Sequence, residues 1–585
     1  MLKDGLRPTT QSIVMTLRIL FLSYALMLAV VISRAELIPA NRLFNWQAGV
    51  NVGVPGGIPT NRTTIINVTS APYNADKTGS TDASSAINSA IGAAGPGTIV
   101  YLPAGTYRID SSVSLRNRSD LTLRGAGPAQ TILDVRIPYG AAIFAGADTQ
   151  WPDNYNTGGA AITAGLVQGS TAITVSDPSL FSVGDIAVLT ESNDPTLPVV
   201  DVNAYNRSRG QLSRVTAKSG SNLTLYPALH WTFGSGRSPK AHPLLAKVAN
   251  VGIEDLTVNL TNTTSPFGIW LEQADRCWIK NANITGQSNY GIYMLYAFES
   301  EVRHCDIRNR KTGGTNGAGI LMERSTSTLM EDNILVGVFP HLEVNFMSTG
   351  NVFAYNFCED SSVFGMVGCS IDSNHGPHNS FNLYEGNIAP NIQCDGYFGS
   401  TSDDTVFRNW FHGTSPTADN RQPVLLQRFT RNYSLVGNIL GKTGQSYPGI
   451  YSLGLPNMGN SGFTGTAQLS QGNVWADWGG SPGASGFQEL DLDVQATTIL
   501  KANYNTVAGG IPANESLGSD TLPVSFYRST KPVWFGTLTW PAFNPFSPNQ
   551  NIQAIPAGYR YVNGSDPATG QIQAPSNAII MISVF

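Results

Sequence analysis

The chain has 585 residues, of which 41% are hydrophobic and 13% are charged, and its formal net charge is −5. The hydrophobic content excludes a disordered chain, and the negative charge argues against nucleic acid as a partner. One ordinary core does not accommodate this length, whereas a solenoid extends its core one repeat at a time.

Residues 1–35 have the pattern of a secretory signal peptide. Arg18 precedes an apolar run that extends to Ile32, and residues 33–35 (SRA) form a small-x-small cleavage pattern. The apolar run is short for the roughly 20 residues of a membrane-spanning helix. We therefore expect a secreted protein, extracellular or periplasmic, with no stable membrane anchor.

Two segments come before the main repeats. Residues 36–65 are polar and rich in Gly and Pro, and they are predicted to lead into the fold. Within residues 66–157, Asp82 is predicted to cap a short amphipathic helix that Gly95-Pro96-Gly97 ends. We expect this helix to cover the open end of a stacked β core, and the strands after it to form the first coils.

Residues 66–136 resemble a known family. The segments GSTDASSAINSAI, GTIVYLPAGTYRI and LTLRGAGPAQTIL look like the opening of the pectate lyase superfamily, in its rhamnogalacturonase/epimerase-like branch. The resemblance implies a right-handed parallel β-helix that acts on or binds a polysaccharide. It names no reaction, because lyases, hydrolases, epimerases and phage tailspikes share this opening segment.

Residues 158–247 interrupt the coils. They contain AITAGLVQGSTAITVSD, GDIAVLTES and SRVTAKSGSNLTLYPALHW, in which apolar and polar residues alternate between turn residues. This pattern predicts a small antiparallel β insertion beside the main fold. Such an insertion could wall one end of a groove.

Residues 248–477 repeat a short strand followed by a turn. The strands GIWLE, GIYMLY, GILME, HLEVN, DSNHG, DGYFG and VLLQR start 22 to 31 residues apart, with no helical spacing between them. A period of this size is typical of a solenoid, so the sequence predicts an all-β fold, a parallel β-helix. A column of amides is expected to satisfy the backbone of successive turns. Its predicted members are Asn283, Asn333, Asn356, Asn387, Asn438 and Asn473.

Residues 478–585 form a tail without periodicity that is rich in Pro and Trp. We expect it to wrap over the last coil, where apolar side chains would otherwise meet water. Sugar binding by Trp534 and Trp540 is the alternative interpretation.

A candidate site follows from the alternation of side chains along the strands. In GIWLE, Ile269 and Leu271 should point inward, so Trp270 and Glu272 should point outward. Carried through the coils, this alternation places polar residues outward in the middle of the solenoid. The predicted column consists of His341, Asp372 and Asp395, with Glu343 beside it and His375 in the following loop.

Stacked carboxyls suit acid–base chemistry. Each raises the cost of ionising the other, so one could stay protonated as a general acid while the other is charged. Asp372 and Asp395 are the predicted acid/base or nucleophile pair, assisted by His341, Glu343 and His375. The predicted substrate contacts, which include flat faces for sugar rings, are Trp270, Tyr293, Tyr397, Glu323 and Arg428.

These residues predict an enzyme that cleaves a polysaccharide, and the carboxylate pair favours hydrolysis. A lyase or C5-epimerase acting on a uronate-containing chain is the close alternative, in which Arg428 or Ca²⁺ would neutralise the uronate carboxylate. No other cofactor and no protein metal site are expected. A non-catalytic glycan-binding or adhesion β-helix is a further alternative function. The stacked acids could also be a solvated surface without a function, although stacked like charges cost stability.

Overall fold

A computed structural model describes residues 37–147, 158–194, 197, 199, 206–244, 246–263, 267–311, 317–359, 370–396, 398–414, 422–447, 449–454 and 491–570. The predicted signal peptide, Asn473 and Tyr397 lie outside these residues. None of the helices in this part of the chain has the length and apolar character needed to cross a bilayer.

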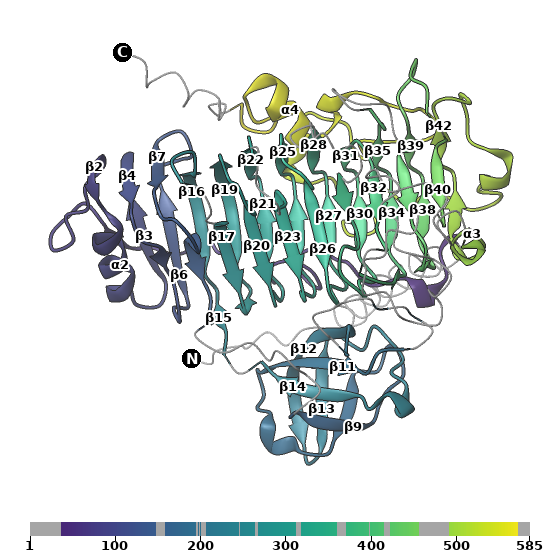
Figure 1. Ribbon diagram of the computed structural model, residues 1–585, viewed down its shortest axis with the longest axis horizontal. Coiled ribbons are helices and arrows are strands. Elements are labelled where there is room, and N and C mark those ends of the chain that lie inside the picture. The colour runs from purple at the N-terminus through teal and green to yellow at the C-terminus, as the bar shows by residue number, and fades with distance from the viewer. Residues whose placement is uncertain are drawn as a thin grey trace, which may run out of the picture.

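The body of the protein is an elongated stack of coils with three parallel β-sheet faces (Figure 1). The first face is a ten-stranded sheet, hereafter the site face. Its strands are β5 (Val113–Ser114), β8 (Ala141–Ala145), β17 (Phe267–Glu272), β20 (Ile292–Leu295), β23 (Ile320–Glu323), β26 (Leu342–Asn345), β29 (Ile371–Asp372), β32 (Ile392–Cys394), β36 (Val424–Leu426) and β40 (Tyr451–Leu453).

The other two faces belong to one 22-stranded sheet that bends between them. One row contains β1 (Thr64–Asn67), β3 (Thr98–Leu102), β6 (Leu121–Gly125), β16 (Gly252–Asn259), β19 (Trp278–Thr285), β21 (Glu301–Arg303), β24 (Leu329–Glu331), β27 (Val352–Ala354), β30 (Leu383–Glu385), β34 (Thr405–Phe407), β38 (Ser434–Val436) and β41 (Ile499–Lys501). The long strands β16 and β19 also enter the other row, whose further members are β2 (Thr78–Asp82), β4 (Gly105–Ile109), β7 (Thr131–Val135), β22 (Asp306–Arg308), β25 (Ile334–Val336), β28 (Phe357–Glu359), β31 (Ile388–Ala389), β35 (Trp410–Phe411), β39 (Ile439–Leu440) and β42 (Tyr504–Asn505). Two short parallel pairs, β15 (Val248–Ala249) with β18 (Ala274–Asp275) and β33 (Thr401–Ser402) with β37 (Thr430–Arg431), lie between the faces. The predicted parallel β-helix is confirmed.

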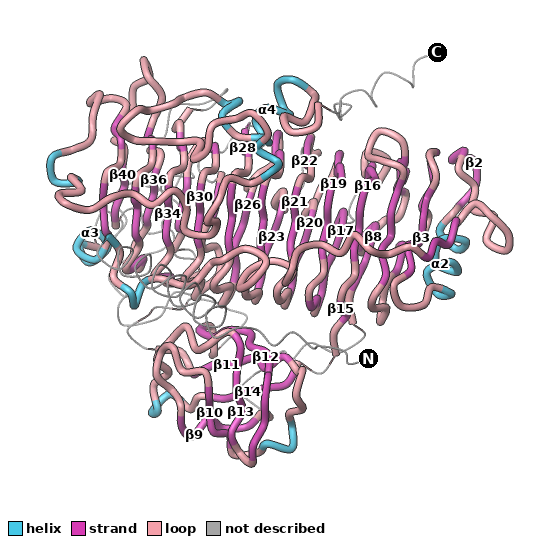
Figure 2. The backbone as a smooth tube through the Cα atoms, turned by 180° about the vertical axis from the view of Figure 1, so that it is seen from behind, coloured by secondary structure: helices cyan, strands magenta, loops and turns pink. Residues whose placement is uncertain are grey.

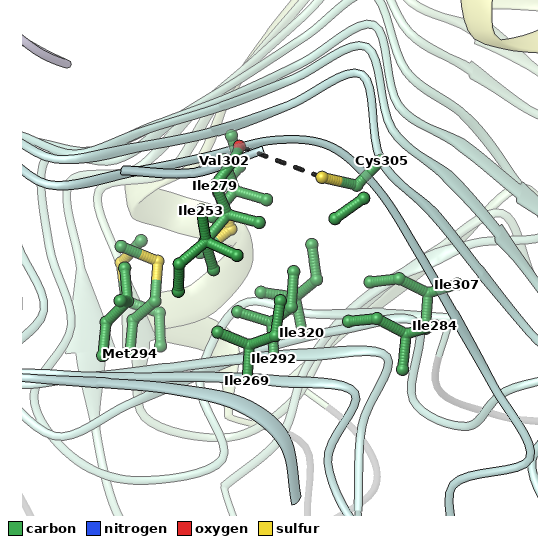
Figure 3. Close-up of a cluster of buried hydrophobic side chains, with 14 of the residues drawn as sticks. Ile253, Ile269, Ile279, Ile284, Ile292, Met294, Val302, Cys305, Ile307 and Ile320 are labelled. Carbon is green, nitrogen blue, oxygen red and sulfur yellow. Dashed lines mark hydrogen bonds between the residues drawn. The ribbon is translucent and has the colours of Figure 1, made fainter. Parts of the chain in front are cut away.

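Apolar side chains from all three faces meet in a core that runs along the stack (Figure 3). Ile269, Ile292 and Ile320 form one column from the site face, because their strands pair residue by residue. Cys305 is buried in the same core, and its Sγ donates to the Ile279 carbonyl at 3.8 Å. Such columns explain the repeated aliphatic positions of the sequence, since each coil covers the apolar surface of the next.

The predicted Asn ladder is present with altered membership. The side-chain amides of successive coils hydrogen-bond one another at 2.9–3.0 Å, and each also donates to a backbone carbonyl. Asn283 is not a member, because it pairs with Asp306 one residue beyond the turn position. The ladder residues in the described chain are Asn333, Asn356, Asn387, Asn409, Asn438 and Asn503.

Helix α2 (Ser84–Ala93) covers the first coil, as predicted. Its buried Ile87 and Ile91 belong to the main core cluster. The helix begins one residue later than a cap at Asp82 requires: Ala83 is the N-cap residue, and the Asp82 carboxylate accepts hydrogen bonds from the Ser84 amide and hydroxyl.

The predicted β insertion is a closed antiparallel barrel that lies beside the middle coils (Figures 1 and 2). The Arg214 guanidinium binds the carboxylates of Asp275 at 2.6 Å and Glu299 at 2.7 Å, both on the β-helix. The Leu212 amide donates to Thr326 Oγ1 at 3.0 Å. These contacts fix the barrel against the β-helix. Its strands are β9 (Ala160–Ala164), β10 (Ala172–Val175), β11 (Ile186–Glu191), β12 (Arg209–Ser219), β13 (Asn222–Tyr226) and β14 (Lys240–Pro243).

The C-terminal segment differs from its prediction. After helix α3 (Leu492–Thr497), strands β41 and β42 pair with β38 and β39 and add a further coil, so the β-helix continues beyond residue 477. The chain then runs back along the side of the coils to helix α4 (Pro556–Asn563), which lies near β25 and β28 (Figure 1). Phe526, Phe535 and Phe543 pack there in a second apolar cluster. This segment covers a lateral face of the solenoid because apolar residues point outward on that face.

The two tryptophans of the tail belong to this packing. The Trp540 indole donates to Tyr355 Oη at 2.8 Å, and the Trp534 ring meets the Tyr355 ring edge-on. The buried Arg408 donates to the carbonyls of Pro523 and Phe543, which holds the tail in place. The contacts of Trp534 and Trp540 are therefore those of structural residues.

Candidate active site

The pairing of strands places Glu343 and Asp372 directly opposite each other. β26 pairs with β29 so that Glu343 faces Asp372, and β29 pairs with β32 so that Asp372 faces Gln393. The predicted column of His341, Asp372 and Asp395 is therefore wrong in its register. Asp372 shares a column with Glu343, and Asp395 lies two residues beyond Gln393 along the chain.

The inward residues explain this register. Ile371 pairs with Ile392, which pairs with Val424, and all three are buried in the core. Val424 and Leu426 therefore point inward, so the outward alternation carried from GIWLE, which would place them outward, fails in this strand. A shift of one residue in the alignment of VLLQR reverses the face of every side chain in that strand.

Four ionisable residues meet on the site face: Glu343, Asp372, His375 and Asp395, hereafter the acid cluster. His375 Nδ1 lies 2.7 Å from Asp395 Oδ2 and 3.8 Å from Asp372 Oδ2. Asp372 Oδ1 accepts a hydrogen bond from the Asn374 amide at 3.1 Å. The three carboxyls are buried, whereas 37% of the His375 side chain is exposed. The imidazole is therefore the part of the acid cluster that meets solvent.

The members of the acid cluster differ in the protonation state that their surroundings favour. Burial raises the pKa of Glu343, and the nearby charge of His375 only partly opposes this effect. Burial by itself would lower the pKa of His375, but the charge and hydrogen bond of Asp395, together with Glu343 and Asp372, raise it to about 10. At neutral pH His375 is consequently an imidazolium, and Glu343 is the carboxyl whose protonated form is favoured.

Asp372, His375 and Asp395 also have the spacing of a metal site, with one ligand atom from each lying within 4.8 Å of the other two. Ca²⁺ prefers six to eight oxygen ligands, whereas this group offers two carboxylates and an imidazole. A metal-bound imidazole must also be neutral, and these carboxylates favour its protonated form. The residues present therefore fit Ca²⁺ poorly and fit a cluster of paired charges well.

Several buried side-chain amide atoms near the acid cluster make no hydrogen bond within the described chain, although Asn345 Nδ2 donates to Glu343 Oε1 at 2.9 Å. They include Asn345 Oδ1 and Gln393 Nε2, and Gln427 Nε2 lies in the following coil. Gln393 occupies the same column as Asp372. An unsatisfied buried polar atom costs about 1–3 kcal/mol, so these groups are suited to a ligand that supplies many hydroxyls. These amides could have been predicted as ligand contacts from the sequence, because they occupy outward positions of the strands.

Two aromatic side chains beside the acid cluster were not predicted from the sequence. The Phe398 ring meets His375 edge-on, with 5.1 Å between the ring centroids, and Phe346 lies 6.4 Å from Phe398. Asn374 Nδ2 donates to the carbonyls of Asp395 and Gly399, which ties the two loops together. These contacts hold the imidazole beside the carboxyls.

Other predicted site residues lie apart or are engaged elsewhere. His341 is fully buried, with Nε2 2.9 Å from the Glu359 carbonyl and Nδ1 2.9 Å from Ser370 Oγ. Tyr293 Oη donates to Glu323 Oε2 at 2.9 Å, and both side chains are buried.

Arg428 and Trp270 are two further predicted substrate contacts. Arg428 is buried, and its guanidinium lies 5.4 Å from the centre of the Phe429 ring. Trp270 lines a separate pocket nearer the N-terminus. The roles assigned to these residues and to Tyr397 stay predictions.

Family comparisons agree with this architecture. Residues 65–296 match the family model described as rhamnogalacturonase A/epimerase, pectate lyase-like, and residues 246–416 match that of the right-handed β-helix region. The first and middle coils thus match a pectate lyase-like family and a right-handed β-helix family. The resemblance seen at residues 66–136 is thereby confirmed, and so is the right-handed sense of the coils. No curated protein matches this pectate lyase-like chain by sequence.

Solved structures similar to this pectate lyase-like protein include viral and bacterial proteins. The tailspike protein gp49 from Pseudomonas phage LKA1 is 13% identical with a TM-score of 0.47, and the match covers 65% of this chain and 64% of the tailspike. The A-module of the Azotobacter vinelandii mannuronan C-5 epimerase is 14% identical with a TM-score of 0.33, and the match covers 66% of this chain and 90% of the module. The Yersinia enterocolitica family 28 exopolygalacturonase is 13% identical with a TM-score of 0.30, and the match covers 66% of this chain and 67% of that protein. Likenesses at this level assign no reaction to the chain.

Proposed function

We propose that the protein is a carbohydrate-active enzyme that hydrolyses a polysaccharide at the acid cluster. The observation that carries the proposal is the pairing of Glu343 with Asp372 on adjacent parallel strands, with both carboxyls buried. Two carboxyls in that position do not both ionise readily, so the pair provides a proton donor and a charged partner.

The surroundings favour particular roles for the two residues. Glu343, whose pKa is raised, is the general acid that protonates the leaving oxygen. Asp372 is the carboxylate that attacks the sugar or activates water. Neighbouring strands are about 4.8 Å apart, a spacing close to the roughly 5 Å between the carboxyls of retaining glycosidases. We therefore expect retention of anomeric configuration, with His375, which Asp395 holds in place, stabilising the charge on Asp372.

The test is an assay of the purified protein, with its predicted signal segment removed, on pectic, alginate and neutral polysaccharides. New reducing ends without ultraviolet absorbance from an unsaturated uronate would support hydrolysis. Glu343→Gln and Asp372→Asn should each lower kcat about 100-fold or more. Asp306→Asn is a matched control, because Asp306 pairs with Arg308 on another face of the β-helix. Equal activity in the Asp372 variant and the wild type would contradict the proposal.

One observation favours a second candidate, a lyase or C5-epimerase acting on a polyuronate. His375 is cationic at neutral pH and partly exposed, so it could neutralise a substrate carboxylate before the adjacent proton is removed. In that case reducing ends and ultraviolet absorbance would rise together, or NMR would show an epimerised product. Binding without any of these changes would instead support a glycan-binding or adhesion protein.

Secretion is part of the proposal, since the expected substrate is an extracellular polymer. Its support is the signal-like pattern of residues 1–35. Expression of the whole chain in a secreting host, followed by N-terminal sequencing of the exported protein, tests it. Retention of the intact N-terminus inside the cell would contradict it.

A further inference from the structure

A separate pocket of about 500 Å³ opens on the site face near the N-terminal coils. It is lined by residues of β8 and β17, by the neighbouring loops 110–112 and 137–140, and by Arg116 and Ala147. This volume falls within the range of small-molecule binding pockets.

The pocket is in line with the acid cluster. Trp270, which lines it, pairs with Tyr293; Tyr293 pairs with Leu321, and Leu321 pairs with Glu343. Trp270 and Glu343 therefore occupy one outward column, three strand spacings or about 14 Å apart. An oligosaccharide lying along this face would span both places.

Two polar atoms of the pocket are unsatisfied. Trp270 Nε1 and Ser112 Oγ are buried and make no hydrogen bond within the described chain. Beside them the Glu272 carboxyl is 6% exposed, and burial raises its pKa to about 7. Burying a polar atom without a partner costs about 1–3 kcal/mol, so a simple structural surface would not retain two beside a desolvated carboxyl. A ligand with several hydroxyls would satisfy them.

Aromatic rings provide the apolar part of the pocket. Trp270 and Phe144 meet edge-on with 5.6 Å between their ring centroids, and Tyr139, which is 78% exposed, stands at the rim. Flat apolar rings beside hydrogen-bonding groups match the two sides of a sugar ring.

The charges of the lining indicate what kind of sugar fits. Asp110 and Glu272 are acids, and Arg116 is the cation among the described lining residues. The Arg116 guanidinium lies 4.4 Å from the centre of the Phe144 ring. A uronate carboxylate would face the buried Glu272 carboxyl, whereas neutral hydroxyls would hydrogen-bond to it.

We propose that this pocket binds one uncharged sugar residue of the polysaccharide and holds the chain along the site face. The proposal rests on the proposed function for its substrate class and adds a recognition site distant from the acid cluster. The carboxyl of Glu272 accepts sugar hydroxyls, Trp270 donates through Nε1, and the rings of Trp270 and Tyr139 pack on the sugar.

Direct binding measurements test the proposal. Galactose, glucose, mannose, rhamnose and galacturonic acid are titrated into the wild-type protein by saturation-transfer NMR and calorimetry. At least one neutral sugar should bind more tightly than galacturonic acid. Glu272→Gln and Trp270→Phe should each weaken that binding about ten-fold, the effect of losing a hydrogen bond to a buried partner.

Trp231→Phe is the matched control, because Trp231 also buries an indole N–H without a hydrogen-bond partner in the described chain but lies beside Phe381, away from the pocket. It should leave the affinity unchanged. The proposal is overturned if no neutral sugar binds, if galacturonic acid binds more tightly than all of them, or if the two pocket variants bind as the wild type does. Melting curves establish that each variant is folded.

The same measurements in Asp372→Asn separate this proposal from the proposed function. Sugar binding should persist in that variant, since Asp372 lies a further strand beyond Glu343. If the wild type binds sugar through Glu272 but cleaves no polysaccharide, the proposal for the pocket stands and the proposed hydrolysis is refuted. If it cleaves a polysaccharide but shows no such binding, the proposed hydrolysis stands and the proposal for the pocket is refuted.

Discussion

Glu343 and Asp372 stand opposite each other on adjacent parallel strands, and both carboxyls are buried. Stacked acids on a sheet are destabilising unless something offsets their charge. Here His375 provides the cation, held 2.7 Å from Asp395 and facing both other acids. The buried Glu343 carboxyl still costs stability in its charged form, a cost that a surface without a function would avoid, which supports its assignment to the reactive centre.

Replacing Glu343 by Gln should separate activity from stability. Burial raises the pKa of Glu343, so the folded protein disfavours its charged form, and stability is lost as pH rises above about 4.5. The Gln variant should therefore be at least as stable as the wild type at pH 7, although its kcat is lower by about 100-fold or more. Urea denaturation and reducing-end assays check the two parts. A variant that is inactive because it is unfolded would contradict this expectation.

The stability contributed by His375 should depend on pH. Its pKa is raised from 6.5 to about 10, so the contribution is fully present below pH 6.5 and is lost as pH rises toward 10. Because 37% of the side chain is exposed, solvent screening reduces the effect to about 1–2 kcal/mol. The difference in unfolding free energy between wild type and His375→Gln should shrink by that amount from pH 6 to pH 10. A difference independent of pH would refute this pairing.

Glu272 should also make stability fall as pH rises, but because its charged form is buried rather than because a favourable charge is lost. Burial raises its pKa from 4.5 to about 7, which Arg116 only partly opposes. The protonated form is compatible with the fold, so stability declines as pH rises from 4.5 through 7, by up to about 3 kcal/mol. Glu272→Gln should remove this decline, and chemical denaturation at pH 5 and pH 8 measures it. Parallel pH profiles for the two proteins would show that the carboxyl is not desolvated.

Removal of divalent cations should leave the protein unchanged. His375 would be a ligand of any ion held with Asp372 and Asp395, but these carboxylates keep it protonated, and an imidazolium does not bind a metal. A chelator should therefore alter neither the melting temperature nor the activity on any substrate found. Loss of activity on chelation, with recovery on adding Ca²⁺, would instead favour the lyase alternative.

The Asn ladder should be sensitive to single substitutions. Asn387 Oδ1 accepts from the amide and the side chain of Asn356, while its Nδ2 donates to the Phe353 carbonyl and to Asn409. Asn387→Ala leaves these buried groups without partners and should lower the unfolding free energy by about 2–4 kcal/mol. Equilibrium denaturation measures the loss, with the exposed Asn61→Ala as the control. An equal effect in both variants would show that the ladder contributes nothing specific.

Local patterns were sufficient to predict the architecture. A parallel β-helix repeats one strand-and-turn unit, so its inward aliphatic residues and its turn amides recur in the sequence whatever the length of the loops between them. The helix at Ser84–Ala93 and the barrel insertion were recognisable for the same reason, since each has its own periodicity. The residues of the acid cluster were also named, because polar and ionisable residues take the place of glycine and aliphatic residues in the middle strands.

Only the tertiary structure decided which of these residues meet. The loops between coils differ in length, so the sequence did not show whether Asp372 stands beside His341 or beside Glu343. Backbone pairing of Leu342 with Ile371 and of Ile371 with Ile392 settled the register, because those side chains must enter one continuous core. The same constraint turned Val424 inward. The sequence by itself determined the kind of fold and the chemical groups it carries, whereas packing between coils distant in the chain determined their arrangement.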